Sequence, residues 1–227
     1  MVWSEPMRWS AAAPPPAIND QRSAASMRSL SLGCLVLPFG SGGCPASGDQ
    51  HWVDSRSLVA CPCHPVPVYS LLEQSVVDHL QSLGANFSIM EIAPDFADTA
   101  AFCERYDVGL EESANAILIA SKRPVGRLAL CLGLATSRLD VNHKVKALME
   151  VSKLSFASAE ATIEATGMEI GGVTPFGIPS TLPVLVDRQV AALDSCVVGG
   201  GSRRIKVRLD PEVFMRMETV RVEDLTG

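Results

Sequence analysis

The segment EIGGVTPFGIPSTLPVLVD, residues 169–187, constrains the fold more tightly than any other part of this sequence. Its glycines let the backbone approach a neighbouring group closely, and its prolines fix φ and reduce the entropy lost when the loop becomes ordered. The backbone here is rich in residues without side chains and is also rigid, and it leads directly into the apolar strand PVLVD. Two interpretations stay open: a rigid clamp around a ligand, or a tight crossover that passes close to a sheet.

A clamp built from GGVTPFG presents backbone N–H groups to a carbonyl or phosphate oxygen, and Thr174 adds a hydroxyl. A second glycine-rich stretch, VVGGGSRRIKVRLDP, joins two apolar strands and contains more glycines than a hairpin needs. If the apolar residues of IKVRL face the core, strand alternation places Arg204, Lys206 and Arg208 together on the opposite face. Three such cations either follow a phosphate backbone or form an ordinary solvated face.

Composition indicates a globular domain with an extension. The chain has 227 residues, of which 47% are apolar and 19% charged, enough to bury one core. Residues 1–65 are rich in Pro, Gly, Ser and Ala without a sustained period, so we expect a disordered or poorly ordered N-terminal extension before a single domain over residues 66–227. No apolar run is long enough to span a bilayer, so no membrane partner is expected.

Charge and cysteine content narrow the possible partners. The net charge of −6 argues against binding DNA or RNA through overall electrostatic attraction, although a local basic patch remains compatible with it. The seven cysteines are an odd number, and Cys103, Cys131 and Cys196 lie in apolar runs where thiols pack as small hydrophobic groups. This pattern is typical of a reducing compartment, and we expect a cytoplasmic protein.

Periodicity and capping residues predict a mixed α/β domain. Ser70 and Glu73 form a capping box before apolar residues at helical spacing. The remaining signals predict helices over 99–106, 140–149 and 158–167 and from residue 211, with strands over 87–92, 116–120, 127–135, 183–187, 195–198 and 205–209. Because helices and strands interleave while consecutive strands also pair, we expect an α+β type fold with a mixed, partly barrel-like sheet surrounded by helices.

Familiar hydrolytic and metal motifs are missing. The sequence has no GxSxG, HExxH or P-loop pattern, and Cys103 and Cys131 are better explained as core residues than as nucleophiles. The CPCH stretch that contains Cys61 and His64 fits no familiar zinc spacing. We expect no metal and no cofactor, so any catalysis would depend on backbone donors and on the substrate itself.

The stretches TGMEIGGVTPFGIPSTLPVLVD and VVGGGSRRIKVRLDP together resemble the YbaK/ProX family. Its members are trans-editing aminoacyl-tRNA deacylases related to the editing domain of bacterial prolyl-tRNA synthetase. The resemblance covers about residues 70–220, and the GxxxP core from Gly171 to Pro175 is its most specific part. It implies a single mixed α/β domain that hydrolyses the ester of a mischarged tRNA and releases a small amino acid. It also implies that a substrate group or a bound water attacks while loop amides hold the carbonyl.

The resemblance also implies roles for individual residues. The catalytic positions are Asn115 and Gly172. The residues expected to shape the aminoacyl pocket or line its rim are Gly171, Thr174, Pro175, Gly177, Gly199, Gly201, Ser202 and Arg203. The tRNA contacts are assigned to Arg204, Lys206 and Arg208 on the strand alternation described above. The implied partners are aminoacyl-tRNA and an aminoacyl-tRNA synthetase.

One position departs from the family pattern. A family lysine at the start of a strand corresponds here to Asn115, which can form hydrogen bonds but carries no charge. Lys122 is expected in a turn and on the strand face opposite Asn115, so it cannot replace the family lysine. Lys144 and Lys153 are the other lysines that could supply the charge. Three functions therefore stay open: a deacylase, a catalytically idle module that binds aminoacyl-tRNA or a small ligand, and a small-molecule hydrolase unrelated to tRNA.

Overall fold

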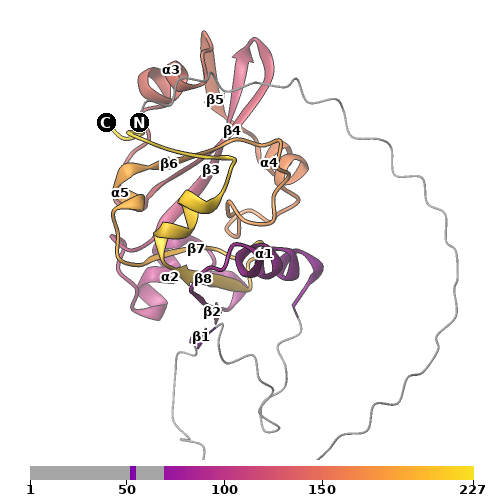
Figure 1. Ribbon diagram of the computed structural model, residues 1–227, viewed down its shortest axis with the longest axis vertical. Helices are drawn as coiled ribbons and strands as arrows, with labels where there is room; N and C mark the ends of the chain where they lie inside the picture. Colours follow the sequence, from indigo (N-terminus) through magenta and orange to yellow (C-terminus); the bar gives the residue numbers. More distant parts are fainter. Residues whose placement is uncertain (1–51, 55–68) are drawn as a thin grey trace, which may run out of the picture. The chain divides into compact units, whose positions relative to one another are not determined.

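The computed structural model describes residues 52–54 and 69–227 (Figure 1). The strands are β1 (Trp52–Asp54), β2 (Phe87–Glu91), β3 (Ala114–Arg123), β4 (Val125–Leu134), β5 (Lys153–Phe156), β6 (Val184–Asp187), β7 (Cys196–Gly199), β8 (Ile205–Leu209) and β9 (Val220–Glu223). The helical elements are α1 (Leu71–Ser82), η2 (Pro94–Phe96), α2 (Thr99–Tyr106), η3 (Val141–Val145), α3 (Lys146–Leu148), α4 (Ala159–Thr166), α5 (Arg188–Ala191) and η4 (Pro211–Arg216). The mixed α/β class predicted from the sequence is confirmed.

The strands form two sheets. The first has the order β1-β2-β8-β7 and is antiparallel throughout. The second has the order β5-β3-β4-β6-β9, in which β5, β3 and β4 are antiparallel and β4, β6 and β9 are parallel. A bridge between Ser113 and Val197 joins the sheets where β3 begins. The expected barrel-like curvature therefore takes the form of two linked sheets, with no closed barrel among the described strands.

Three apolar clusters hold these layers together. The largest lies between the sheets and includes Val76 and Leu80 of α1, Leu132 of β4 and Val207 of β8. A second cluster packs η3 and α3 on the far face of the second sheet, and a third packs α2 on the far face of the first sheet through Phe102. The first sheet is thus covered on both faces, so side chains of β8 can be buried on either face.

Local capping explains where the predicted helices begin and end. Ser70 accepts the N–H of Glu73 while the Glu73 carboxylate accepts the N–H of Ser70, which is the predicted capping box of α1. Ser158 caps α4, and Gly167 ends it with φ of 73°, a conformation that costs glycine little. These two helices are confirmed, as are α2 and the hairpin of β3 and β4.

Other elements differ from the predictions. The segment after Asp140 forms the π-helical turn η3 before the short α3, and the segment from Pro211 forms a 3-10 helix. The strands β5 and β9 and the helix α5 were not predicted, because each has only four residues and lacks the continuous apolar run that marks β6 and β7. Residues 52–54, within the segment assigned to the N-terminal extension, pair with β2 as β1, while residues 1–51 and 55–65 lie outside the described part of the chain.

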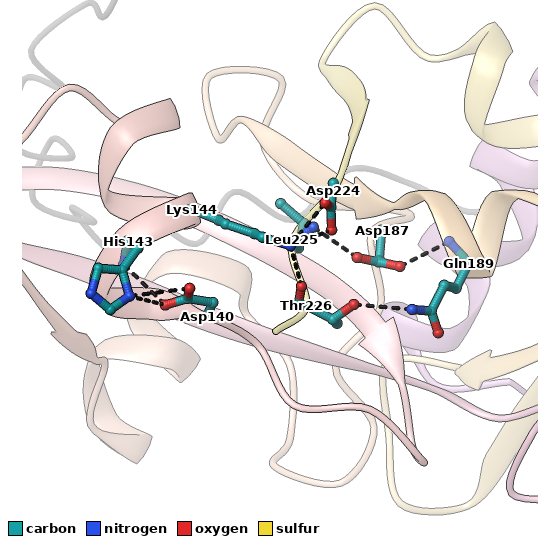
Figure 2. Close-up of polar contacts among 8 residues, drawn as sticks. All are labelled: Asp140, His143, Lys144, Asp187, Gln189, Asp224, Leu225 and Thr226. Carbon is teal, nitrogen blue, oxygen red and sulfur yellow. Dashed lines mark hydrogen bonds and ion pairs between the residues drawn. The ribbon is translucent and has the colours of Figure 1, made fainter.

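Polar contacts fasten the C-terminal segment to the second sheet (Figure 2). Asp187, which is buried, accepts the N–H of Gln189 at 2.8 Å and the N–H of Leu225 at 2.8 Å. Lys144 forms an ion pair with Asp224 at 2.8 Å, and Leu225 is fully buried in the second cluster. Within the described residues, no helix is both long and apolar enough to cross a membrane.

Candidate active site

A cavity of about 390 Å³ lies where β3 and the start of α2 meet a glycine-rich loop. We call residues 169–183 the first loop and residues 200–204 the second loop. The walls of the cavity come from residues 97–99, residues 114–118 of β3, residues 157, 159 and 162 around the start of α4, residues 170, 171 and 173 of the first loop, and Gly199 and Lys206. This volume lies within the range of small-ligand pockets, about 300–1,000 Å³.

Gly172 in the first loop and Gly199 at the end of β7 allow the backbones around the site to touch. A Cβ atom on Gly172 would lie 2.2 Å from the carbonyl oxygen of Ser202, and one on Gly199 would lie 2.4 Å from the carbonyl oxygen of Gly172. The N–H of Gly201 donates to the Gly172 carbonyl at 2.7 Å, and the N–H of Glu169 donates to the Gly201 carbonyl at 3.2 Å. Any side chain at these positions would separate the loops, which is the physical reason for the bare backbone.

The N–H groups of the first loop divide into two sets. The N–H of Gly172 donates to Glu169 at 2.9 Å, and the N–H of Gly177 donates to Nδ1 of His79 at 3.0 Å, so both serve the loop structure. In the described part of the chain, the N–H groups of Gly171 and Val173 have no hydrogen-bond acceptor, and both residues line the cavity. These two amides are therefore available to a ligand oxygen, whereas Gly172, assigned as catalytic from the sequence, joins the two loops.

Asn115 lies in the cavity wall on β3, as the sequence predicted for a site residue. Its side-chain oxygen Oδ1 accepts the hydroxyl of Thr99 at 2.5 Å. This contact fixes the amide so that its nitrogen is the group left to donate toward a ligand. Thr99 was not identified from the sequence as a site residue. The sequence indicated only that it lies at the start of a helix.

Lys206 is the largest difference from the sequence prediction. Its side chain is only 6% exposed, and Nζ donates to the carbonyl of Ala97 at 2.8 Å and to the carbonyl of Gly171 at 2.9 Å. Strand alternation does place it opposite the core face, but α2 covers that face and brings the Phe102 ring to 5.5 Å from Nζ. Burial lowers the pKa of this lysine to about 8.

The three cations expected in one exposed row are therefore separated. Arg204 is exposed, with its Nε 4.0 Å from the Glu73 carboxylate, and Arg208 pairs with Glu112 at 2.7 Å. Lys206 lies in the cavity wall and cannot follow a phosphate backbone on the surface. The prediction of a solvent-facing Lys206 was wrong because sequence alternation gives the face of a strand but not what covers that face.

The second loop is fastened to α1. Ser202 donates its hydroxyl to the buried carboxylate of Glu73, and Gly201 adopts φ of 93° beside Val76. Burial by itself would raise the pKa of Glu73, but hydrogen bonds from Ser202 and Ser70 and the charge of Arg204 lower it below its ordinary value. Ser202 and Gly201 thus position the loop from behind and do not line the cavity.

Arg203 joins the loops on the outer side of the cavity. It donates to the carbonyls of Pro94 at 3.1 Å and Ile170 at 3.0 Å, and its guanidinium lies 3.4 Å from Asp98. Together with Glu169, Ile163 and Arg204 it lines a second, shallower depression next to the cavity. This position agrees with the rim expected for it from the sequence.

Of the other expected pocket residues, Gly171 and Gly199 line the cavity. Thr174, Pro175 and Gly177 belong to the part of the first loop that does not line it. Thr174 is fully buried, and its hydroxyl has no hydrogen-bond partner among the described residues. Gly177 packs against Ser75 and Val76 of α1. Only part of the first loop therefore lines the cavity.

The buried thiols are core groups. Burial raises the pKa values of Cys131 and Cys196 to about 12, which keeps both as unreactive thiols. Cys103 is also buried, with its sulfur 3.2 Å from the Ser113 hydroxyl. Among the described residues no cluster of His, Cys, Asp and Glu could hold a metal ion, and the CPCH stretch lies outside those residues.

The family model of the aminoacyl-tRNA editing domain matches residues 93–217, more than half of the chain and nearly all of the site. This chain belongs to the aminoacyl-tRNA editing domain family. Its fold is also similar to two solved structures. One, described as a candidate trans-editing enzyme for prolyl tRNA synthetase, has 21% identity and a TM-score of 0.60. The similarity covers 70% of this chain and 99% of that protein. The other, a hypothetical protein, has 21% identity and a TM-score of 0.61. The similarity covers 67% of this chain and 99% of that protein.

The match leaves β1, α1, β2 and β9 of this editing domain outside its bounds, although α1 supplies Glu73 and His79, which hold the two loops. Of the charged side chains in its cavity wall, Asp98 lies at the exposed side and Lys206 is buried. The neutral Asn115 and the buried Lys206 thus share the same cavity.

Proposed function

We propose that this editing domain hydrolyses the ester bond of mischarged aminoacyl-tRNA and releases a small amino acid. The observation that carries the proposal is the pair of N–H groups on Gly171 and Val173, which line the cavity without an acceptor in the described part of the chain. Donors fixed in this way stabilise the oxygen of an ester carbonyl as negative charge develops on it. An aminoacyl-tRNA synthetase that produces the mischarged tRNA is the proposed partner.

The reaction needs no protein nucleophile. A water molecule adds to the carbonyl carbon, either directly or after a hydroxyl of the substrate has displaced the ribose oxygen and formed a second ester that water then cleaves. In each addition the two amides hold the oxygen that gains the electron pair. The bond between the carbonyl carbon and the ribose oxygen then breaks, and the ribose oxygen takes up the proton that the attacking group loses. The cavity admits only the aminoacyl end of the tRNA, so the net charge of −6 does not oppose this step, because the body of the tRNA stays outside.

The decisive experiment is a deacylation panel. The full-length chain is incubated with tRNAs that each carry a wrong small amino acid, and free amino acid is measured against a heat-denatured control. We expect release from at least one member of the panel. If no tRNA is deacylated, the proposal of catalysis fails.

Binding of a stable aminoacyl-adenosine analogue with an amide in place of the ester separates the remaining functions. Binding without turnover identifies the idle module, and Asn115→Lys is then expected to restore turnover if the missing charge at that position is the cause. Turnover of small acyl esters with no turnover of aminoacyl-tRNA would instead identify a hydrolase unrelated to tRNA.

A further inference from the structure

Lys206 is a buried cation without a carboxylate at ion-pair distance in the described part of the chain. Its side chain is 6% exposed, and its closest polar contacts are two carbonyl oxygens. The charged and titratable groups that face it are Asp98 before α2, Cys103 on α2 and Arg203 in the second loop. Burial of an ammonium group without a neutralising partner costs stability, so its retention beside a cavity calls for a role.

The hydrogen bonds of Lys206 leave one donor for the cavity. A lysine ammonium has three N–H groups, and two of them are used by Ala97 and Gly171. Both carbonyls belong to segments that line the cavity, and Lys206 lines it too. The two bonds therefore hold the ammonium at the cavity wall and leave its third N–H for a ligand atom.

The surrounding backbone keeps this position open. Gly199 lies directly opposite Lys206 in the pairing of β7 with β8, and it lacks the side chain that would otherwise extend over the same face. The carbonyls of Gly172 and Val173 occupy the space where its Cβ would be. The ammonium thus lies beneath the part of the first loop where the amides of Gly171 and Val173, which have no acceptor among the described residues, line the same cavity.

Asn115 does not provide this charge. Its amide is neutral, and its oxygen is already bonded to Thr99. We propose that Lys206 is a catalytic residue of this cavity, whose third N–H contacts the carbonyl oxygen of the bound acyl ester and stabilises the negative charge that forms there. This inference rests on the proposed function. The lysine stays protonated throughout: attack moves the carbonyl electron pair to the oxygen, and expulsion of the ribose oxygen returns it.

The test compares Lys206→Met with the wild-type full-length chain. Methionine keeps approximately the length of the side chain and removes its charge and its N–H donors. The control is Lys122→Met, which removes an exposed lysine of the β3–β4 hairpin. We expect Lys206→Met to lower kcat at least 100-fold with an unchanged or higher urea midpoint, and Lys122→Met to change kcat less than twofold.

A pH profile separates a charged donor from a structural anchor. Because the pKa of Lys206 is about 8, kcat of the wild type is expected to fall as the pH rises through 8, since only the ammonium form stabilises the charge. A Lys206→Met variant that keeps kcat within threefold of the wild type would overturn the inference and leave the proposed function standing. A variant that loses activity only in proportion to a lowered urea midpoint would also overturn it.

The inference remains testable if the wild type shows no turnover. In that case the probe is the aminoacyl-adenosine amide analogue, measured by calorimetry with both variants. Wild-type binding that Lys206→Met weakens at least tenfold supports the contact while rejecting hydrolysis as the function. Equal binding by the two proteins, or no binding by the wild type, overturns the inference.

Discussion

The hydroxyl of Ser202 donates a hydrogen bond to the buried carboxylate of Glu73, and this contact ties the second loop to the first turn of α1. The two residues are 129 positions apart, so the bond joins the start of the described domain to its glycine-rich site. Because the first and second loops touch through their backbones, a constraint on one is a constraint on the other. The site is therefore held from outside the segments that form it.

Removal of this bond is expected to destabilise the protein. Ser202→Ala leaves the buried Glu73 carboxylate without one donor, and we expect a loss of about 2 kcal/mol in the free energy of unfolding, typical of a hydrogen bond to a charged group. Urea denaturation measures this loss. A double-mutant cycle with Glu73→Ala isolates the pair, and a coupling energy near zero would show that the contact contributes nothing.

The bare backbone contact between the loops predicts strong effects of very small substitutions. Gly199→Ala places a Cβ atom within about 2.5 Å of two carbonyl oxygens, and we expect a loss of at least about 3 kcal/mol in the free energy of unfolding. Gly109→Ala is the control, because its nearest atoms belong to the flexible carboxylate of Glu111. Equal urea midpoints for the two variants would contradict the proposed contact.

His79 predicts a dependence of stability on pH. Burial lowers the pKa of His79 below its ordinary value of 6.5, and its Nδ1 must be unprotonated to accept the N–H of Gly177. The unfolded chain therefore takes up a proton first as the pH falls, so stability is fully present above 6.5 and is lost as the pH drops through the folded-state pKa.

Urea unfolding at pH 7, 6 and 5 measures this loss. His79→Gln keeps a neutral acceptor for Gly177 and is expected to flatten the stability profile over the same window. The prediction is wrong if the wild type and His79→Gln lose the same stability between pH 7 and pH 5.

The hydrogen bonds of Asp187 are expected to hold the C-terminal segment against the second sheet (Figure 2). Asp187→Ala removes the acceptor of two backbone N–H groups, those of Gln189 and Leu225, and we expect a loss of about 3 kcal/mol in the free energy of unfolding. Lys144→Ala breaks only a partly exposed ion pair and is expected to cost less than about 1 kcal/mol. Thermal unfolding of both variants tests this order, and a larger effect of Lys144→Ala would reverse the assignment.

Arg204 predicts how tRNA binding depends on salt. It is the exposed member of the three cations around β8, with a side chain 61% exposed. Arg204→Gln is expected to reduce the slope of log affinity against log salt concentration by about 0.7 to 1, the effect of one lost phosphate contact. Arg221→Gln on β9 is the control. Identical slopes for the wild type and Arg204→Gln would place the tRNA elsewhere.

Much of the site could be predicted because its signals are local. Ser70 and Glu73 are three residues apart and form their capping box within one helical turn, and Gly167 ends its own helix. The glycines and prolines of residues 169–183 likewise predicted a stiff loop without reference to the rest of the chain. Short elements such as β9 could not be predicted, because its pairing with β6 is formed by residues 36 positions away and leaves no local pattern.

The sequence by itself determined the boundaries of α1, α2 and α4, the two glycine-rich loops and the family to which they point, because caps, turns and glycine-rich backbone are properties of neighbouring residues. Only the tertiary structure decided that Gly172 joins the loops and that Lys206 lies in the cavity wall. It also decided that the amides of Gly171 and Val173 have no acceptor within the described part of the chain. Alternation along β8 gave the side to which Lys206 points. The packing of α2 over that side depends on contacts between distant segments, and it buries Lys206.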